Sequence, residues 1–228
     1  MKAASSHGST STRADSPVDD LAIRFVNTAA WQSLLDLGAQ SPCRREIEER
    51  LPSPAELLMW LQSNGLLSKD QRTSLQRVWK QNEDVARSLY GSAIALRELI
   101  YNLLSARIDD RAPAEADVAA FNNFLSSHVH SAGIAWRAGE YGWEVPGSQV
   151  SRTSLLMPIA LSAAELLTGV RASRIRQCQD DRGCGWLFVD ESRAQNRRWC
   201  SMGDCGNRAK AQRHYQRAKR QRMASENS

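Results

Sequence analysis

The amino-acid sequence predicts a mainly α-helical N-terminal domain with one β-hairpin, followed by a small α+β module built around cysteines. Apolar residues recur at helical spacing between capping signals over most of residues 50–170, and the period changes to that of a β-strand only near residues 133–145. Four of the five cysteines then fall between residues 178 and 205. These features divide the chain into a leader at residues 1–17, a helical domain at 18–170, a cysteine module at 171–222 and a tail at 223–228.

The composition is that of a folded protein, with 42% apolar and 24% charged residues in a chain of 228. The most apolar stretch, residues 155–170, is interrupted by Pro158 and Glu165, so a transmembrane helix is not expected. Residues 1–16 are rich in Ser, Thr and Ala and lack the apolar core of a secretion signal. We therefore expect a cytoplasmic protein with a disordered leader and no membrane partner.

Signals for secondary structure are weak in the first fifty residues and clear after them. Leu21–Trp31 could begin either a helix or a strand, and the polar, charged segment Ser41–Arg50 is typical of a loop. A helix start follows, with Ser53 as the N-cap and Pro54 at the first helical position. We expect this helix to end at the pair Asn64–Gly65.

The next two helical regions are longer. Ser68 and Gln71 form a capping-box pattern, and helical spacing continues from there to Ile108. That length predicts either two helices or one bent helix, with Gly91 as the candidate break. Pro113–Ser126 carries the pattern of a further helix.

A β-hairpin is predicted where the helical period stops. Gly133–Arg137 and Tyr141–Val145 flank a turn that contains Gly139. Its aromatic residues could line a pocket, although packing against the helices is the simpler interpretation; they are Trp136, Tyr141 and Trp143. Ser151–Gly169 then returns to helical spacing, and Pro158 should kink that helix or mark its true start.

The cysteine spacing predicts a metal site. Cys178 and Cys184 form a C-x5-C pair, Cys200 and Cys205 form a C-x4-C pair, and Cys43 stands alone with no assigned role. In a chain without an export signal, reduced thiols that bind metal are a better interpretation than two disulfides. Four thiolates suit one zinc ion, and such a closed tetrahedral set describes a structural rather than a catalytic site.

The flanking segments give this zinc site a fold. Arg174–Arg176 and Trp186–Val189 have the composition of strands on either side of the first cysteine pair, which places that pair in a hairpin. Cys205 is followed at once by a helical stretch, so the second pair lies at a helix N-terminus, where thiolates are stabilised. A hairpin knuckle with a ligand in the first helical turn is the treble-clef arrangement.

The positive charge of the chain is concentrated in the same segment. Residues 171–222 have a balance of +9 and residues 1–170 a balance of −3, and no acidic residue lies between Cys205 and Glu226. On the predicted helix, four cations share one face within about 80°: Lys210, Arg213, Arg217 and Arg220. A stripe of Ala211, Tyr215 and Ala218 lies nearly opposite, and we expect that stripe to dock on the zinc hairpin.

This distribution predicts a polyanionic partner, a nucleic acid, for the basic helix. The candidate phosphate contacts are Arg197, Arg198, Arg208, Lys210, Arg213, Arg217 and Arg220. Gln212 and Gln216 lie between the two faces of the helix and are candidates for contacts with base edges.

No catalytic site is expected. The sequence has no Gly-rich phosphate loop and no Ser/His/Asp set, and its zinc site has no open position. His128 and His130 would share one face of a strand, but no third metal ligand accompanies them. His214 is expected on the surface of the basic helix. These features argue against an enzyme.

The C-terminal residues closely resemble the CGNR zinc-finger family of bacterial proteins. The motifs RIRQC, CGWLFVDESR and RRWCSMGDCGNRAKAQRHYQR carry this resemblance over roughly residues 171–220. The N-terminal region resembles the ABATE domain that precedes this finger in the family, through Phe25–Thr28 (FVNT), Ala95–Leu99 (ALREL) and Ser162–Leu167 (SAAELL). The resemblance implies a stress-induced transcription regulator with a DNA-binding treble clef behind a sensing or interaction domain.

Two departures from the family pattern and several open choices remain at this point. The C-x5-C loop is one residue longer than expected, and Arg24 stands where an acidic residue is expected before FVNT. Asn207 is expected to fix the turn, whereas Arg208 could reach a phosphate or brace Asp190. The alternative to a DNA-binding regulator is a protein-interaction or RNA-binding zinc module. A small-molecule or protein effector for the N-terminal domain and a homodimer follow only by analogy.

Overall fold

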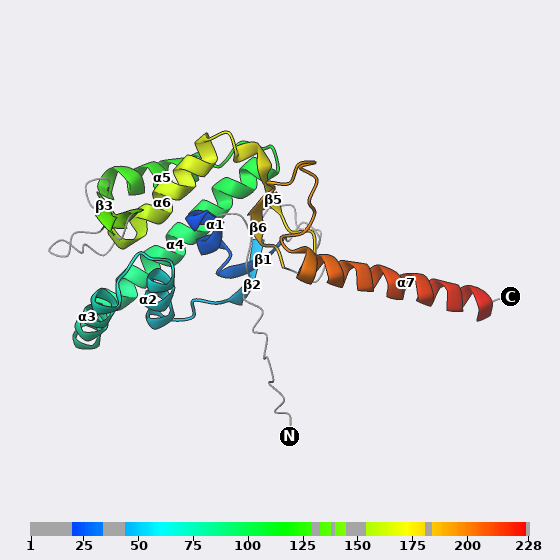
Figure 1. Cartoon of the computed structure of the whole chain (residues 1–228), viewed down its shortest axis with the longest axis horizontal. Coiled ribbons are helices and arrows are strands. Elements are labelled where there is room, and N and C mark those ends of the chain that lie inside the picture. The colour runs from blue at the N-terminus through cyan, green and yellow to red at the C-terminus, as the bar shows by residue number, and fades with distance from the viewer. Residues whose placement is uncertain are drawn as a thin grey trace, which may run out of the picture.

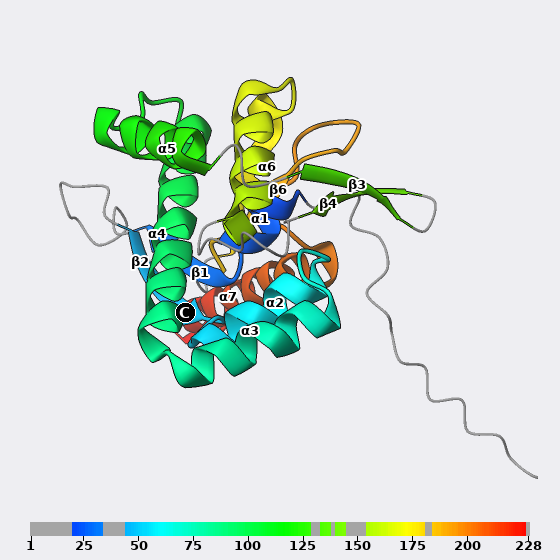
Figure 2. The ribbon, with the colours of Figure 1, turned by 90° about the vertical axis from the view of Figure 1, so that its left-hand side faces the viewer.

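The computed structural model describes residues 20–33, 44–128, 133–137, 140–144, 154–180 and 184–226. Helices form the body of the molecule (Figures 1 and 2). A small cysteine module lies against one end of this body, and the last helix projects away from both (Figure 1). The predicted fold class is confirmed: a mainly helical part with a β-hairpin precedes a small module with clustered cysteines. Among the described residues, no helix is both long enough and apolar enough to cross a bilayer.

The elements follow one another in this order: α1 Leu21–Val26, β1 Ala29–Ser33, β2 Arg44–Glu49, α2 Pro54–Ser63, α3 Lys69–Gln81, α4 Glu83–Ile108, α5 Glu115–His128, β3 Gly133–Arg137, β4 Glu140–Glu144, α6 Met157–Thr168, β5 Ile175–Gln177, β6 Leu187–Val189 and α7 Asn207–Glu226. A short 3-10 turn, Ser154–Leu156, precedes α6, so Pro158 marks the start of that helix rather than a kink.

The predicted helix starts are present with their capping contacts. The Ser53 hydroxyl accepts a hydrogen bond from the backbone N–H of Ala55 at 3.2 Å. Ser68 and Gln71 form a reciprocal capping box, with N···O distances of 3.1 and 2.8 Å. The break between α3 and α4 lies at Asn82 and not at Gly91, because the Asn82 side chain accepts from the backbone N–H of Val85 and starts a new helix.

The prediction of a loop at Ser41–Arg50 is wrong for most of that segment. Strand β2 pairs antiparallel with β1 and places Ala29 opposite Glu49. The segment Leu21–Trp31 therefore contains both a helix and the beginning of a strand. The polar composition of β2 concealed it, since the backbone ladder that holds a two-stranded ribbon does not require apolar side chains.

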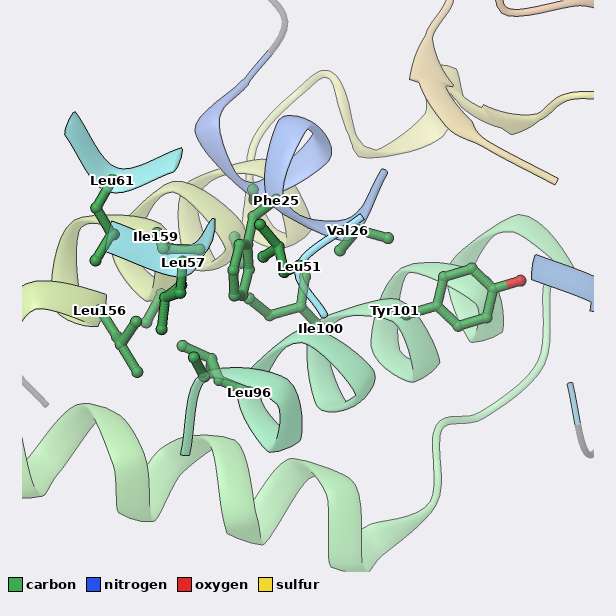
Figure 3. Packing of buried hydrophobic residues seen from close by; sticks show 14 of the residues in the cluster. Phe25, Val26, Leu51, Leu57, Leu61, Leu96, Ile100, Tyr101, Leu156 and Ile159 are labelled. Atoms are coloured by element: carbon green, nitrogen blue, oxygen red, sulfur yellow. The ribbon is translucent and has the colours of Figure 1, made fainter. Parts of the chain in front are cut away.

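Helix α4 forms the centre of the core. It packs against α1, α2, α3, α5 and α6, and its apolar side chains meet those of α1, α2 and α6 (Figure 3). Phe25, Leu57, Ile100 and Ile159 are all inaccessible to solvent. Burying each such side chain stabilises the fold by about 1.5–3 kcal/mol.

One cation lies inside this core. Arg97 on α4 has no solvent exposure, and its guanidinium donates to the Thr28 hydroxyl at 3.0 Å and to the Glu49 carboxylate at 2.8 Å, with a second bond to the other carboxylate oxygen. Thr28 lies between α1 and β1, and Glu49 ends β2. The buried charge therefore fixes the turn after α1 and the end of β2 relative to α4.

The predicted hairpin is present, with Gly133 opposite Glu144 and Arg137 opposite Glu140. The side chains of its aromatic residues lie outside the part of the chain that the structure describes, so the aromatic pocket stays a prediction. Cys43, His130 and the side chain of His128 also lie outside the part of the chain that the structure describes.

The cysteine module shares the main core through strands β5 and β6. Ile175 and Leu187 are buried in the same cluster as the helical side chains. Cys178 donates its backbone N–H to the carbonyl of Trp186 at 2.8 Å. Hydrogen-bonded and non-hydrogen-bonded pairs alternate along an antiparallel ladder, so the next pair, Gln177 opposite Leu187, is not hydrogen-bonded. The backbone N–H and C=O of Leu187 consequently point away from β5.

Asn27 completes the backbone bonding of Leu187. Its amide oxygen accepts from the N–H of Leu187 at 2.9 Å, and its amide nitrogen donates to the carbonyl of Leu187 at 2.8 Å. One side chain of the helical domain thus takes the place of a neighbouring strand. Gln177 adds a bond to the hydroxyl of Tyr101 at 3.1 Å, and Arg174 forms an ion pair with Glu191 at 2.9 Å.

Replacing Asn27 should loosen the cysteine module from the helical body. We expect Asn27→Ala to lower the free energy of unfolding by about 1–3 kcal/mol, because both backbone groups of Leu187 lose their partner. The melting temperature should fall by about 2–4 °C per kcal/mol in a chain of this size. The matched control is Asn102→Ala at an exposed position of α4, which should not lower stability. Equal melting temperatures for both variants would contradict this role of Asn27.

Candidate zinc centre and basic helix

Four short segments bring the cysteines together. Cys178 directly follows β5, Cys184 precedes β6, Cys200 follows β6 in a loop, and Cys205 lies in the turn Met202–Gly206 that leads into α7. Their sulfur atoms all lie within 4.8 Å of one another. The predicted hairpin knuckle and the ligand at a helix start are therefore both present.

The sulfur positions fit a zinc ion. The Sγ atoms of Cys184 and Cys200 are 3.7 Å apart, and those of Cys200 and Cys205 are 3.6 Å apart. Four thiolates about 2.3 Å from a tetrahedral zinc ion would lie about 3.8 Å from one another. The longer C-x5-C loop thus does not prevent a tetrahedral arrangement, and the four clustered cysteines fit one structural zinc ion.

The electrostatics of the cluster explain why it needs a cation. Burial, together with repulsion from negative charge on the neighbouring cysteine sulfurs, raises the pKa of Cys205 to about 12. Hydrogen bonds from Cys184 and Cys200 lower the pKa of Cys178, so one thiolate is stabilised by the protons that its neighbours keep. Four thiolates are therefore not stable together without a positive charge between them, and a divalent ion supplies that charge.

Arg208, the arginine of the CGNR sequence, contacts this site directly. Its guanidinium donates to the Sγ of Cys205 at 2.9 Å and to the Asp180 carboxylate at 2.9 and 2.6 Å. The sequence suggested that Arg208 could reach a phosphate or brace Asp190; the residue it braces is Asp180. Asp180 is itself buried, so Arg208 links the last cysteine to the loop that follows the first.

Asp190 instead shapes the loop that leads to Cys200. It is fully buried, and its carboxylate accepts from the backbone N–H groups of Ser192 at 3.0 Å and Arg197 at 2.8 Å. Burial alone would raise the pKa of Asp190, but the hydrogen bonds of Ser192 and Arg197 outweigh it and keep the pKa below its usual value. The carboxylate thus stays charged while it holds the loop.

Two more predicted residues serve the structure of the finger. Arg197 donates to the carbonyl of Cys200 at 2.8 Å, and its guanidinium lies 5.0 Å from the centre of the Phe188 ring. Asn207 donates to the carbonyl of Gly203 at 2.8 Å and so fixes the turn before α7, the structural role expected for it.

Helix α7 meets the finger only near its start. Ala209 and Gln212 are half-buried, whereas Ala211, Tyr215 and Ala218 are exposed, Tyr215 to 66%. The prediction that this stripe docks on the zinc hairpin is therefore wrong. Helical periodicity predicts which residues share a face of the helix. The turn before the helix sets its direction and so decides which of these faces packs against the finger. The remainder of α7 projects from the molecule (Figure 1).

The seven cations predicted to bind phosphate fall into three groups. Arg197 and Arg208 make the contacts within the finger given above. Lys210, Arg217 and Arg220 are exposed on the projecting helix. Arg198 and Arg213 lie between these groups, with their guanidinium carbons 5.4 and 5.8 Å from the centre of the Trp199 ring.

The sequence did not predict the roles of three residues in this region. Asp180 binds Arg208, Gln179 binds Arg198, and the Trp199 ring contacts both Arg198 and Arg213. An acidic residue two positions after a cysteine ligand was a usable signal for a cation near the metal. Gln179 offered no such signal, because its contact with Arg198 joins segments nineteen residues apart.

Removing the Arg208 side chain should weaken zinc binding. We expect Arg208→Gln to lower zinc affinity about 10- to 100-fold, the range typical of outer-shell partners of a metal site. Competition against a chromogenic chelator measures this affinity. Lys210→Gln removes the same charge from an exposed neighbour and should leave the affinity unchanged. If both variants release zinc as the parent protein does, the bond between Arg208 and Cys205 has no role in metal retention.

Comparison with known families agrees with this architecture. A family model described as ABATE, "Putative stress-induced transcription regulator", matches residues 19–170, and the CGNR zinc finger model matches residues 174–218. These are regulatory and zinc-finger families rather than enzyme families. The comparison with curated proteins gave no match. Since the first model covers more than half of the sequence, the chain belongs to the ABATE family and carries a CGNR zinc finger at its C-terminal end.

Proposed function

We propose that this protein is a transcription regulator that binds duplex DNA through its zinc finger and α7. The observation that carries the proposal is the projecting helix itself. It is 20 residues long, it is exposed over nearly its whole described length, and it carries no acidic residue before Glu226. A helix of this length extends about 30 Å, and its diameter of about 10–12 Å suits a DNA major groove about 12 Å wide.

The arrangement of charge supports the proposal. Lys210, Arg213, Arg217 and Arg220 follow one side of α7. Two acidic residues of the finger, Asp180 and Asp190, have buried side chains and are neutralised or hydrogen-bonded inside it. Those four cations are exposed on α7, where they can replace the counterions of a phosphate backbone.

The N-terminal domain has the position needed for control of DNA binding. Asn27, Gln177 and the shared core residues fix the finger against the helical body, so a ligand or protein that alters the body would alter the finger as well. A small-molecule or protein effector, a homodimer and a cytoplasmic location remain expectations from the sequence.

Charge reversal on one face of α7 tests the proposal. We expect Arg213→Glu together with Arg217→Glu to abolish binding of duplex DNA, measured by fluorescence anisotropy. The parent protein should show a log–log salt slope of about −4 to −5, which corresponds to about five phosphates.

The matched control is Lys219→Glu together with Arg222→Glu, two exposed residues on the opposite side of the same helix. This pair changes the net charge by the same amount and should weaken binding much less. An equal loss in both double variants would mean that net charge, and not this face, drives binding. Unchanged binding in both would refute the role of α7.

A single-stranded RNA partner is the second candidate, and the exposure of Tyr215 favours it. Exposed aromatic side chains stack on unpaired bases, and Tyr215 does not dock on the finger as the sequence suggested. Competition of duplex DNA against single-stranded RNA of equal length distinguishes the two candidates. We expect duplex DNA to displace the RNA. Preferential retention of RNA that is lost in Tyr215→Ala would make RNA the partner.

A further inference from the structure

A polar groove lies between the first turns of α7 and the body of the finger. It has a volume of about 240 Å³, and three glutamines, two arginines and one tryptophan line it beside Ala209: Gln179, Gln212, Gln216, Arg198, Arg213 and Trp199. The zinc ligands themselves do not line it, so this groove is a feature separate from the metal site.

The two arginines of the groove are held in place through one nitrogen each. The Nε of Arg198 donates to the Gln179 side chain at 2.7 Å, and the Nε of Arg213 donates to the carbonyl of Ala209 at 3.3 Å. Both guanidinium groups also lie over the Trp199 ring. Among the described residues, the terminal nitrogens of these two guanidinium groups form no hydrogen bond. They can therefore donate to a phosphate oxygen from fixed positions.

The two glutamines supply a different chemistry. Gln212 and Gln216 are four residues apart on α7 and therefore lie on the same face, one turn from each other. A side-chain amide presents one donor and one acceptor side by side, which matches the N7 acceptor and N6 donor of adenine in the major groove. The face that carries them adjoins the cationic side of α7, because Arg213 belongs to both.

We infer that this groove is the base-reading site of the finger, with Gln212 and Gln216 directed at an adenine edge and Arg198 and Arg213 at the adjacent phosphate. The inference rests on the proposed binding of duplex DNA and adds its source of sequence preference. The arginines set the position of the helix along the backbone, and the glutamines then discriminate between bases. Any base other than adenine leaves one amide group without a partner and costs affinity.

Selection from a pool of random duplexes tests the inference. The parent protein should enrich sites with adenine at one or two fixed positions. Gln212→Ala with Gln216→Ala should lose discrimination at those positions by about 5- to 150-fold per adenine, with an unchanged salt slope on random DNA. Gln221→Ala, an exposed glutamine of the same helix that does not line the groove, should keep the preference of the parent.

DNA that lacks the adenine N7 acceptor tests whether the glutamines of the groove contact that atom. Replacing the selected adenine by 7-deazaadenine removes the N7 acceptor and should weaken binding of the parent protein. The same replacement should have no further effect on the double glutamine variant, since the contact is already lost. Arg198→Ala should lower affinity for all sequences and reduce the salt slope by about one, with the adenine preference retained.

The possible outcomes separate the inference from the proposal beneath it. Absence of any duplex binding by the parent protein would overturn both. Binding without sequence preference, a preference for another base, or an adenine preference that survives in the double glutamine variant would overturn the groove assignment and leave the proposed function standing. Loss of preference in the double variant with unchanged binding of random DNA supports the groove.

Discussion

The neutralisation of one buried cation organises much of the molecule. Arg97 lies in the centre of α4 without access to water, and a guanidinium in that position is tolerated only if its charge is paired. Glu49 provides the charge and Thr28 a further acceptor, so β2 and the turn after α1 must both reach the same point of α4. Asn27 is the neighbour of Thr28 in the chain, and its amide holds β6 of the finger. The segment FVNT and the helix that contains ALREL thus form one continuous link from the core of the body to the zinc module.

A second chain of contacts begins at the metal site. Cys205 accepts a hydrogen bond from Arg208, Arg208 binds Asp180, and Asp180 lies next to Gln179, which holds Arg198 at the groove. The residues that stabilise the thiolates and those that shape the polar groove are therefore neighbours. The loops that carry the cysteine ligands therefore also carry part of the groove, so loss of the metal would be expected to disturb the groove as well.

The sequence was most informative where the structure depends on local signals. The helix starts at Ser53 and Ser68 were predictable because a cap and its partner lie within three residues. The four cysteines were predictable because metal chemistry restricts their type and spacing. Strand β2 was missed because its evidence lies in the distant segment β1, and Asp180 was missed as the partner of Arg208 because only the folded loop brings them together.

The orientation of α7 was beyond sequence reasoning for a related reason. Periodicity separated the cationic side from the stripe that contains Tyr215, and both sides exist as predicted. The stripe is nevertheless exposed, since the turn Met202–Gly206 directs the helix so that Ala209 and Gln212 face the finger. The sequence of a helix defines its faces, but the turn that precedes the helix decides which face packs against the rest of the protein.

The projection of α7 also makes the molecule sensitive to small movements of the finger. In a helix about 30 Å long that contacts the finger only near its start, a small rotation at the start produces a large displacement of the far end. A rotation of about 10° at the anchor moves the tip by about 5 Å, which exceeds the separation of about 3.4 Å between successive base pairs. The side-chain amide of Asn27 holds β6 of the finger from which this helix projects. In the proposed complex with duplex DNA, a small shift of the helical body passed on through Asn27 would therefore change which base step the far end of the helix faces.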